Sequence, residues 1–78
     1  MQNEWITSNP GVLGGKPVIR GTRVSVAFVL KLLSAGWTMD QIMENYPHLT
    51  KEGILSALEY ASRVLDGQWV VPVREEKP

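Results

Sequence analysis

Three cations near the N-terminus are the residues whose types and spacing most favour chemistry with a ligand. Lys16, Arg20 and Arg23 lie close together in a stretch that is rich in glycine. On a β-hairpin, cations at this spacing can contact the phosphates of DNA, and glycine lets the backbone approach closely. An equally weighted alternative is that Arg20 and Arg23 form ion pairs within the chain, for example with Glu44 or Glu59.

Catalysis and metal binding find little support in the sequence. His48 is the one histidine, cysteine is absent, and no aspartate is placed by the sequence to orient this imidazole as a base. Asp40 and Glu44 lie one helical turn apart and are explained more simply as a solvated face than as metal ligands. We therefore predict that the protein is not an enzyme and needs no cofactor or metal.

The composition predicts one small soluble domain over residues 1–78. The chain has 78 residues, equal numbers of basic and acidic side chains, no cysteine and 44% hydrophobic residues. Its longest apolar stretch, Val26–Leu30, is too short to span a bilayer, and the N-terminus lacks a secretory pattern. We expect a cytoplasmic protein with no membrane association. Because a chain of this size buries only about 60% of its surface on folding, we also expect self-association.

Charge is distributed unevenly along the chain. Over residues 1–31 four cations accompany one carboxylate, whereas acidic residues prevail over residues 32–69. A contact with nucleic acid would therefore be local and confined to the first part of the chain. The acidic part would face away from the nucleic acid or face a basic partner.

Residues 1–24 predict a β arm. Proline and glycine recur too often here for a helix, and they separate brief β-favouring runs at residues 5–7, 17–19 and 22–24. We expect turns at Gly14-Gly15 and near Gly21.

Residues 25–67 predict a bundle of three helices, so the expected fold class is mainly α with a small N-terminal β arm. The first helix covers Val26–Ala35, with Ser25 as its N-cap and Gly36 as the residue that ends it. The second is short, because it begins at a capping box over residues 38–41 and must stop before Pro47.

The third helix is expected to begin after its N-cap Thr50, to run to Asp66 and to end at Gly67. Glu59 and Arg63 form a favourably oriented pair on its exposed face. Apolar residues at helical spacing would form its buried seam: Ile54, Leu58, Ala61 and Leu65.

The first helix carries more apolar residues than one core face needs. A stripe at helical spacing is expected to face the core, and it consists of Val26, Val29, Leu30 and Leu33. Phe28 and Leu32 widen the apolar arc beyond this stripe. We therefore predict a homodimer whose interface includes Phe28 and Leu32.

The second helix, the turn after it and the third helix follow the order of a helix-turn-helix, in which the later helix can lie in the DNA major groove. The DNA-facing candidates on this later helix are Thr50, Lys51 and Ser56, whereas Glu52 would repel phosphate. An equally weighted alternative is a three-helix bundle in which the same apolar residues only pack.

Residues 68–78 predict an extended tail. Its apolar side chains Trp69, Val71 and Val73 are candidates for binding a protein partner by adding a strand or filling a groove. The alternative, which we favour somewhat, is that this tail covers the arm or the other copy of a dimer.

The chain resembles a family of small bacterial proteins catalogued as a domain of unknown function and often described as VapB-type antitoxins. The resemblance covers about residues 5–61 and depends on Asn9-Pro10, Gly36, Ile42 and the stretches Gly15–Val26, Tyr46–Thr50 and Ala57–Ala61. It implies a homeodomain-like helix-turn-helix with a strand arm. It also implies a neighbouring gene that encodes a PIN-like ribonuclease toxin, which this protein would neutralise and whose operon it would repress.

These observations lead to one functional expectation and one alternative. We expect an antitoxin-type, DNA-binding regulator of a type II toxin-antitoxin module. The alternative is a dimeric protein-interaction module that does not bind DNA.

Overall fold

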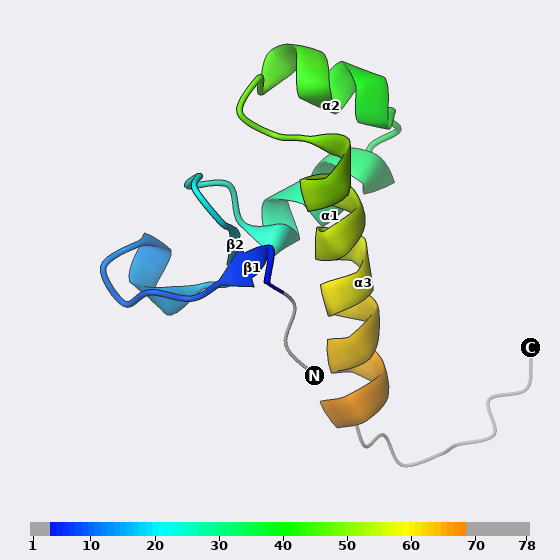
Figure 1. The fold of residues 1–78 in the computed structure, drawn as a ribbon. Helices are drawn as coiled ribbons and strands as arrows, with labels where there is room; N and C mark the ends of the chain where they lie inside the picture. Colours follow the sequence, from blue (N-terminus) through cyan, green and yellow to red (C-terminus); the bar gives the residue numbers. More distant parts are fainter. Residues whose placement is uncertain (1–3, 69–78) are drawn as a thin grey trace, which may run out of the picture.

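The computed structural model describes residues 4–68 of the chain. In chain order these residues form β1 (Ile6–Thr7), a 3-10 turn η1 (Leu13–Gly15), β2 (Val18–Ile19), α1 (Val26–Ser34), α2 (Met39–Asn45) and α3 (Lys51–Gln68) (Figure 1). The described part is thus mainly helical, with three helices and a small two-stranded N-terminal sheet. Within it, no helix combines the length and apolar character needed to cross a membrane.

The N-terminal arm contains the hairpin that the sequence predicts. Strands β1 and β2 pair antiparallel, with Ile6 opposite Ile19. The expected third extended piece, residues 22–24, belongs to a turn instead of a strand. After this turn, Ser25 pairs with Val18 of β2 in an isolated antiparallel bridge. Gly14 and Gly21 have φ angles of 66° and 82° at the two predicted turns. Both turns require the left-handed backbone that glycine adopts without strain.

Helix α1 begins and ends as its local signals predict. The Ser25 hydroxyl accepts a 2.9 Å hydrogen bond from the Phe28 N–H, which confirms Ser25 as the N-cap. The helix ends at Ser34, one residue earlier than expected, and Gly36 follows with a φ angle of 98°.

The buried face of α1 differs from the predicted stripe. Val26, Val29 and Leu32 are buried, whereas Leu30 and Leu33 are only half-buried. Leu32 is 9% exposed and belongs to the core of the single chain. This corrects the expectation that Leu32 lies on a dimer surface, because Leu32 is buried within the single chain, in which α1 packs on α3.

Helix α2 has both halves of the predicted capping box. The Thr38 hydroxyl accepts from the Gln41 N–H at 3.1 Å, and the Gln41 side-chain oxygen accepts from the Thr38 N–H at 2.8 Å. The helix ends at Asn45, before Pro47, as expected. Ile42 is fully buried and attaches this short helix to the core.

Helix α3 begins as predicted but extends further. The Thr50 hydroxyl caps it by accepting a 3.0 Å hydrogen bond from the Gly53 N–H. The helix passes through Gly67 to Gln68, so the predicted end is wrong. Gly67 lacks the positive φ angle that would terminate a helix.

The seam of α3 is also different from the expected one. Ile54 and Ala57 are fully buried, while Leu58 and Ala61 are half-buried. Leu65 is 63% exposed, because the last turns of α3 project beyond α1 and the sheet (Figure 1).

The first turn of α3 packs closely on the sheet at Gly53. A Cβ atom at this position would lie 3.2 Å from the Ile19 Cγ2 and 3.7 Å from the Trp5 Cε3. Ile19 is 2% exposed, so it has little room to move. The absence of a side chain at Gly53 therefore lets the arm and α3 share one core.

Alanine substitutions at two glycines of α3 are expected to have opposite effects. Alanine is favoured over glycine in a helix interior by about 1 kcal/mol. Nothing lies within 4 Å of a Cβ added at Gly67, so Gly67→Ala should stabilise the protein by part of this amount. Gly53→Ala should lower the free energy of unfolding by about 1 to 2 kcal/mol, because the new methyl group presses on Ile19. Urea unfolding measures both, and equal stabilisation by the two variants would contradict the close packing.

Candidate functional site

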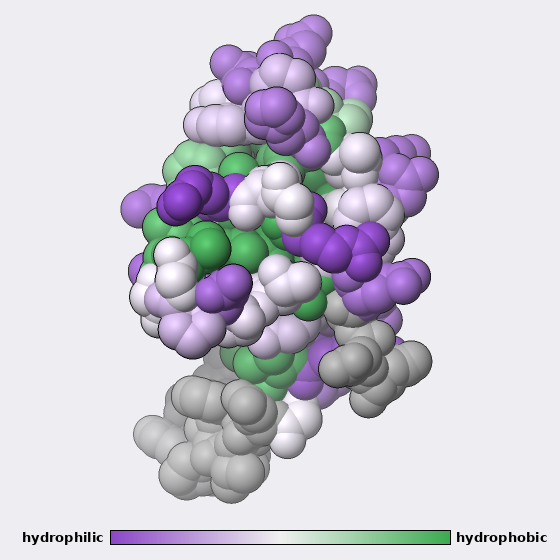
Figure 2. All heavy atoms as spheres, turned by 60° about the vertical axis from the view of Figure 1, so that its left-hand side comes forward, coloured by the Kyte–Doolittle hydropathy of each residue, from purple (hydrophilic) through white to green (hydrophobic). Residues whose placement is uncertain are grey.

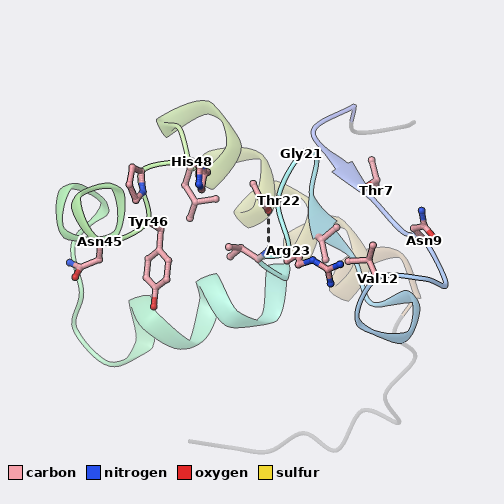
Figure 3. A pocket seen from close by; sticks show the side chains of 13 residues that line it. Thr7, Asn9, Val12, Gly21, Thr22, Arg23, Asn45, Tyr46 and His48 are labelled. Atoms are coloured by element: carbon pink, nitrogen blue, oxygen red, sulfur yellow. Dashed lines mark hydrogen bonds between the residues drawn. The ribbon is translucent and has the colours of Figure 1, made fainter.

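A groove of about 720 Å³ lies between the N-terminal arm and the turn that joins α2 to α3 (Figure 3). We call it the arm-turn groove. Two segments that are far apart in the sequence meet across it, since one side comes from residues 7–24 and the other from residues 45–49. Its lining consists of Thr7, Asn9, Val12, Val18, Gly21, Thr22, Arg23, Val24, Asn45, Tyr46, Pro47, His48 and Leu49.

The arm side of the groove is held by the side chain of Thr22. Its hydroxyl donates to the Ile19 carbonyl at 2.8 Å and accepts from the Val24 N–H at 3.0 Å. The backbone adds a hydrogen bond from the Thr22 N–H to the same Ile19 carbonyl, at 3.0 Å. These bonds fix the turn that carries Arg23 into the groove (Figure 3).

The opposite side of the groove is formed by the turn between α2 and α3. The Leu49 N–H donates to the Tyr46 carbonyl at 2.9 Å, which closes this turn around Pro47. The Tyr46 ring packs edge-on against Phe28, with ring centroids 5.6 Å apart. Leu49 is 3% exposed and reaches into the core. The turn is thereby attached to both α1 and the core.

Arg23 is the charged side chain of the groove lining, which includes no carboxylate. Within residues 4–68 the structure holds one ion pair, between Glu59 and Arg63 at 3.1 Å. The predicted pair on α3 is therefore confirmed. The alternative in which Arg20 and Arg23 pair with Glu44 or Glu59 is wrong for the described residues.

Arg20 has a different partner from the carboxylate that was expected. Its guanidinium carbon lies 5.3 Å from the centre of the Trp5 ring. A guanidinium over an aromatic face is a cation-π contact, which keeps its charge available at the surface while tying the arm together. Arg20 is exposed at this position.

The structure does not bring all the predicted DNA-contacting residues together. Lys16 is exposed but borders a second, apolar groove between α1 and α3, away from the arm-turn groove. Thr50 and Lys51 are exposed at the start of α3, whereas Ser56 is half-buried. Of the predicted DNA-contacting residues, Arg23 is the one that lines the arm-turn groove.

The predicted partner-binding residues have different outcomes. Phe28 is half-buried, and its contact with Tyr46 gives its ring a packing role inside one chain. Its role in a dimer stays a prediction. The tail candidates Trp69, Val71 and Val73 lie outside the described residues.

The reasoning from sequence missed the groove itself and the part played in it by Tyr46 and His48. His48 is exposed, and the sequence favours a surface or packing role for it over that of a catalytic base, without placing it in a groove. A signal was available, because the stretches Gly15–Val26 and Tyr46–Thr50 carry the family resemblance and both contribute to the groove lining. Among residues 4–68, no group of three histidine, cysteine or acidic side chains is arranged to hold a metal ion.

Comparison with known proteins places the groove within a shared region. A family model described as "Protein of unknown function (DUF433)" matches residues 6–61. The uncharacterized protein y4eO of Sinorhizobium fredii (strain NBRC 101917 / NGR234) is 45% identical over 58 residues, which are 74% of this chain and 26% of that protein. The chain therefore spans about a quarter of the length of this curated relative.

A solved structure has a similar fold. The crystal structure of a DUF433 member protein from Anabaena variabilis ATCC 29413 matches with a TM-score of 0.75 and 34% sequence identity. The match covers 83% of this chain and 63% of that one.

Removing the Thr22 hydroxyl is expected to loosen the arm side of the groove. Thr22→Ala loses two hydrogen bonds and should lower the free energy of unfolding by about 1 to 2 kcal/mol. Thr22→Ser keeps the hydroxyl and serves as the matched control. Amide hydrogen exchange at Val24 should be faster in the alanine variant only. Equal exchange rates in both variants would show that the hydroxyl does not hold this turn.

Proposed function

Since the chain belongs to the DUF433 family, we propose that it is a DNA-binding regulator of the antitoxin type. In this proposal its three helices act as a homeodomain-like helix-turn-helix. The observation that carries this proposal is that Arg23, from the arm, and the turn between α2 and α3 line one groove (Figure 3). In a helix-turn-helix the N-terminal residues of the later helix contact the bases in the major groove, and in homeodomains an N-terminal arm also reaches the adjacent minor groove.

The packing of α2 and α3 supports the helix-turn-helix part of the proposal. Ile42, Leu49 and Ile54 are each at most 3% exposed and join the short helix, the turn and the long helix into one core. The exposed residues at the start of α3 include Thr50 and Lys51. This end of α3 is therefore free to approach a duplex.

The charges decide which side of the protein faces DNA. On α3 the exposed carboxylate of Glu52 repels phosphate and Glu59 is paired with Arg63, so this helix offers little net attraction to DNA. Arg20 and Arg23 are exposed on the arm. We infer that DNA lies across the arm and the beginning of α3, with the arm providing most of the phosphate contacts.

The antitoxin part of the proposal depends on the resemblance to VapB-type proteins. The partner would be a PIN-like ribonuclease encoded by a neighbouring gene. A basic, RNA-binding protein is complementary to the acidic residues of α2 and α3, which are exposed at Asp40, Glu44, Glu52 and Glu59.

We further propose a homodimer as the DNA-binding form. A chain of this size gains stability from association, and helix-turn-helix proteins commonly bind two half-sites as dimers. Exposed apolar side chains on α3 add to this argument, since Leu55 is 46% and Leu65 is 63% exposed.

A second candidate function is a dimeric protein-interaction module without DNA binding. The exposed carboxylates of α3 favour it, because they weaken the attraction of this helix to DNA. A gel shift with the DNA upstream of the protein's own gene separates the two functions.

DNA binding by the arm should depend steeply on salt. A dimer that contributes Arg20, Arg23 and Lys51 from each copy neutralises up to about six phosphates, for a slope of about −5 in log affinity against log salt. Arg23→Ala should reduce the magnitude of this slope by about 2, because each dimer loses two contacts. Fluorescence anisotropy over a salt series measures the slope.

Arg63→Ala is the matched control for this experiment. It removes the same charge from the exposed pair on α3, which lies outside the arm. Its slope should equal that of the unaltered protein. An unchanged slope in Arg23→Ala, or equal changes in both variants, would contradict DNA binding through the arm.

Co-expression with the product of the neighbouring gene tests the antitoxin part. The full chain should co-purify with a PIN-like ribonuclease and suppress its cleavage of RNA. Unhindered cleavage of RNA in an excess of this protein would contradict neutralisation of the ribonuclease. It would not affect the result of the DNA-binding experiment.

A further inference from the structure

The arm-turn groove has an apolar floor that phosphate contacts do not use. Val18, Val24 and Leu49 contribute to it, together with Val12 from the arm. Figure 2 shows the side of the molecule that carries the arm, where apolar surface is framed by hydrophilic side chains. The volume of about 720 Å³ is in the range of about 300 to 1,000 Å³ that is typical of ligand-binding clefts.

The rim of the groove combines one cation with polar groups. Arg23 carries the charge, no carboxylate is present in the lining, and no ion pair of Arg23 occurs within residues 4–68. A carboxylate, like a phosphate, can form two parallel hydrogen bonds with a guanidinium, and such charge-assisted pairs are among the stronger hydrogen bonds in proteins. The groove is therefore electrostatically complementary to an acidic group next to an apolar one.

Two amide side chains on opposite sides of the groove suit an extended backbone. The Asn9 side-chain oxygen accepts from the Gly11 N–H at 2.8 Å, which leaves its NH₂ group available as a donor. The Asn45 side-chain nitrogen donates to the Gln41 carbonyl at 2.9 Å, which leaves its oxygen available as an acceptor. Both side chains are exposed and line the groove (Figure 3). A peptide backbone offers one carbonyl and one N–H per residue, which matches this pair.

We propose that the arm-turn groove docks an extended segment of a partner protein in which an aliphatic side chain lies next to a carboxylate. The aliphatic side chain packs on Val24 and its apolar neighbours in the floor, and the carboxylate pairs with Arg23. The amides of Asn9 and Asn45 bind the backbone between them. The proposed function uses only the charge of Arg23 in the arm-turn groove. Docking of a partner segment also gives a role to the rest of the groove.

The floor favours a peptide over a nucleic acid. A sugar-phosphate backbone has no hydrocarbon side chain to bury there, because its sugar carbons are interspersed with oxygens, and its charge is satisfied at the rim. Unpaired bases need an open aromatic face on which to stack. The Tyr46 ring is already in contact with Phe28 at 5.6 Å and with Trp37 at 6.5 Å, which reduces its value as such a platform.

Docking of this segment should also affect DNA binding, and only this consequence rests on the proposed function. Arg23 cannot pair with a partner's carboxylate and a DNA phosphate at the same time. Partner binding and DNA binding should therefore exclude one another at this side chain. The docking itself is measured without DNA, so a failure of DNA binding does not affect it.

A phage-displayed library of random peptides provides the probe. Selection on the intact chain should enrich sequences that contain aspartate or glutamate within two residues of leucine, isoleucine or valine. A synthetic fluorescent peptide of the enriched sequence should bind Arg23→Glu at least about tenfold more weakly than the unaltered protein. Arg63→Glu, which changes the same charge on the exposed face of α3, should bind it normally.

A charge exchange makes the assignment specific. Replacing the acidic residue of the peptide by lysine should abolish binding to the unaltered protein and restore binding to Arg23→Glu. Val12→Asp should weaken the original peptide by adding a carboxylate to the lining, and circular dichroism verifies that each variant is folded.

Four outcomes would overturn the proposal. In the selection, these are a failure to enrich any peptide and the enrichment of peptides without carboxylates. In the binding assay, it is equal affinity of the peptide for Arg23→Glu and Arg63→Glu. In NMR spectra, it is chemical shift changes at the methyl groups of Val18 and Val24 with duplex DNA but not with peptide. The last of these would assign the floor to nucleic acid. Displacement of bound peptide by the upstream DNA tests mutual exclusion separately.

Discussion

The close contact between α3 and β2 is the constraint on which the rest of the structure depends. The hairpin strands are only two residues long, so they cannot form a stable unit alone. Gly53 lets Ile19 approach to within 3.2 Å of where a Cβ would be, and this contact joins the arm to the helical core. Without it, the turn that carries Arg23 would have no fixed position relative to Tyr46, and the groove between them would not exist.

The features that the sequence predicts well are those that act between near neighbours. The caps at Ser25 and Thr50 and the capping box at Thr38 each join residues three positions apart, so residue types alone are sufficient to locate them. The end of α3 is different. A glycine such as Gly67 can either continue a helix or end it. Because no atom lies within 4 Å of a Cβ added there, packing does not decide between the two, and the sequence is ambiguous at this residue.

Burial and partner choice depend on contacts between segments, which residue spacing does not reveal. Leu30 and Leu32 are equally apolar, yet only Leu32 is buried, because the packing of α1 into the core, and not the spacing of its apolar residues, decides which side is covered. Arg20 was expected to contact a carboxylate or a phosphate, but its neighbour in the hairpin is Trp5. The cations of the candidate site could be predicted from the sequence. The groove could not, since Arg23 and His48 come to line the same groove only after the arm has folded back on the helices.

The arrangement of charge affects recognition more than stability. The ion pair between Glu59 and Arg63 is exposed on both sides, so solvent screening leaves it a net contribution of less than about 1 kcal/mol. Exposed cations on the arm act over roughly 8 Å at physiological ionic strength, which is far enough to orient an approaching anion but too short to attract one to the opposite face. The apolar floor of the groove is insensitive to this screening. A ligand that uses the floor as well as Arg23 therefore retains affinity under salt conditions in which a ligand held by charge alone dissociates.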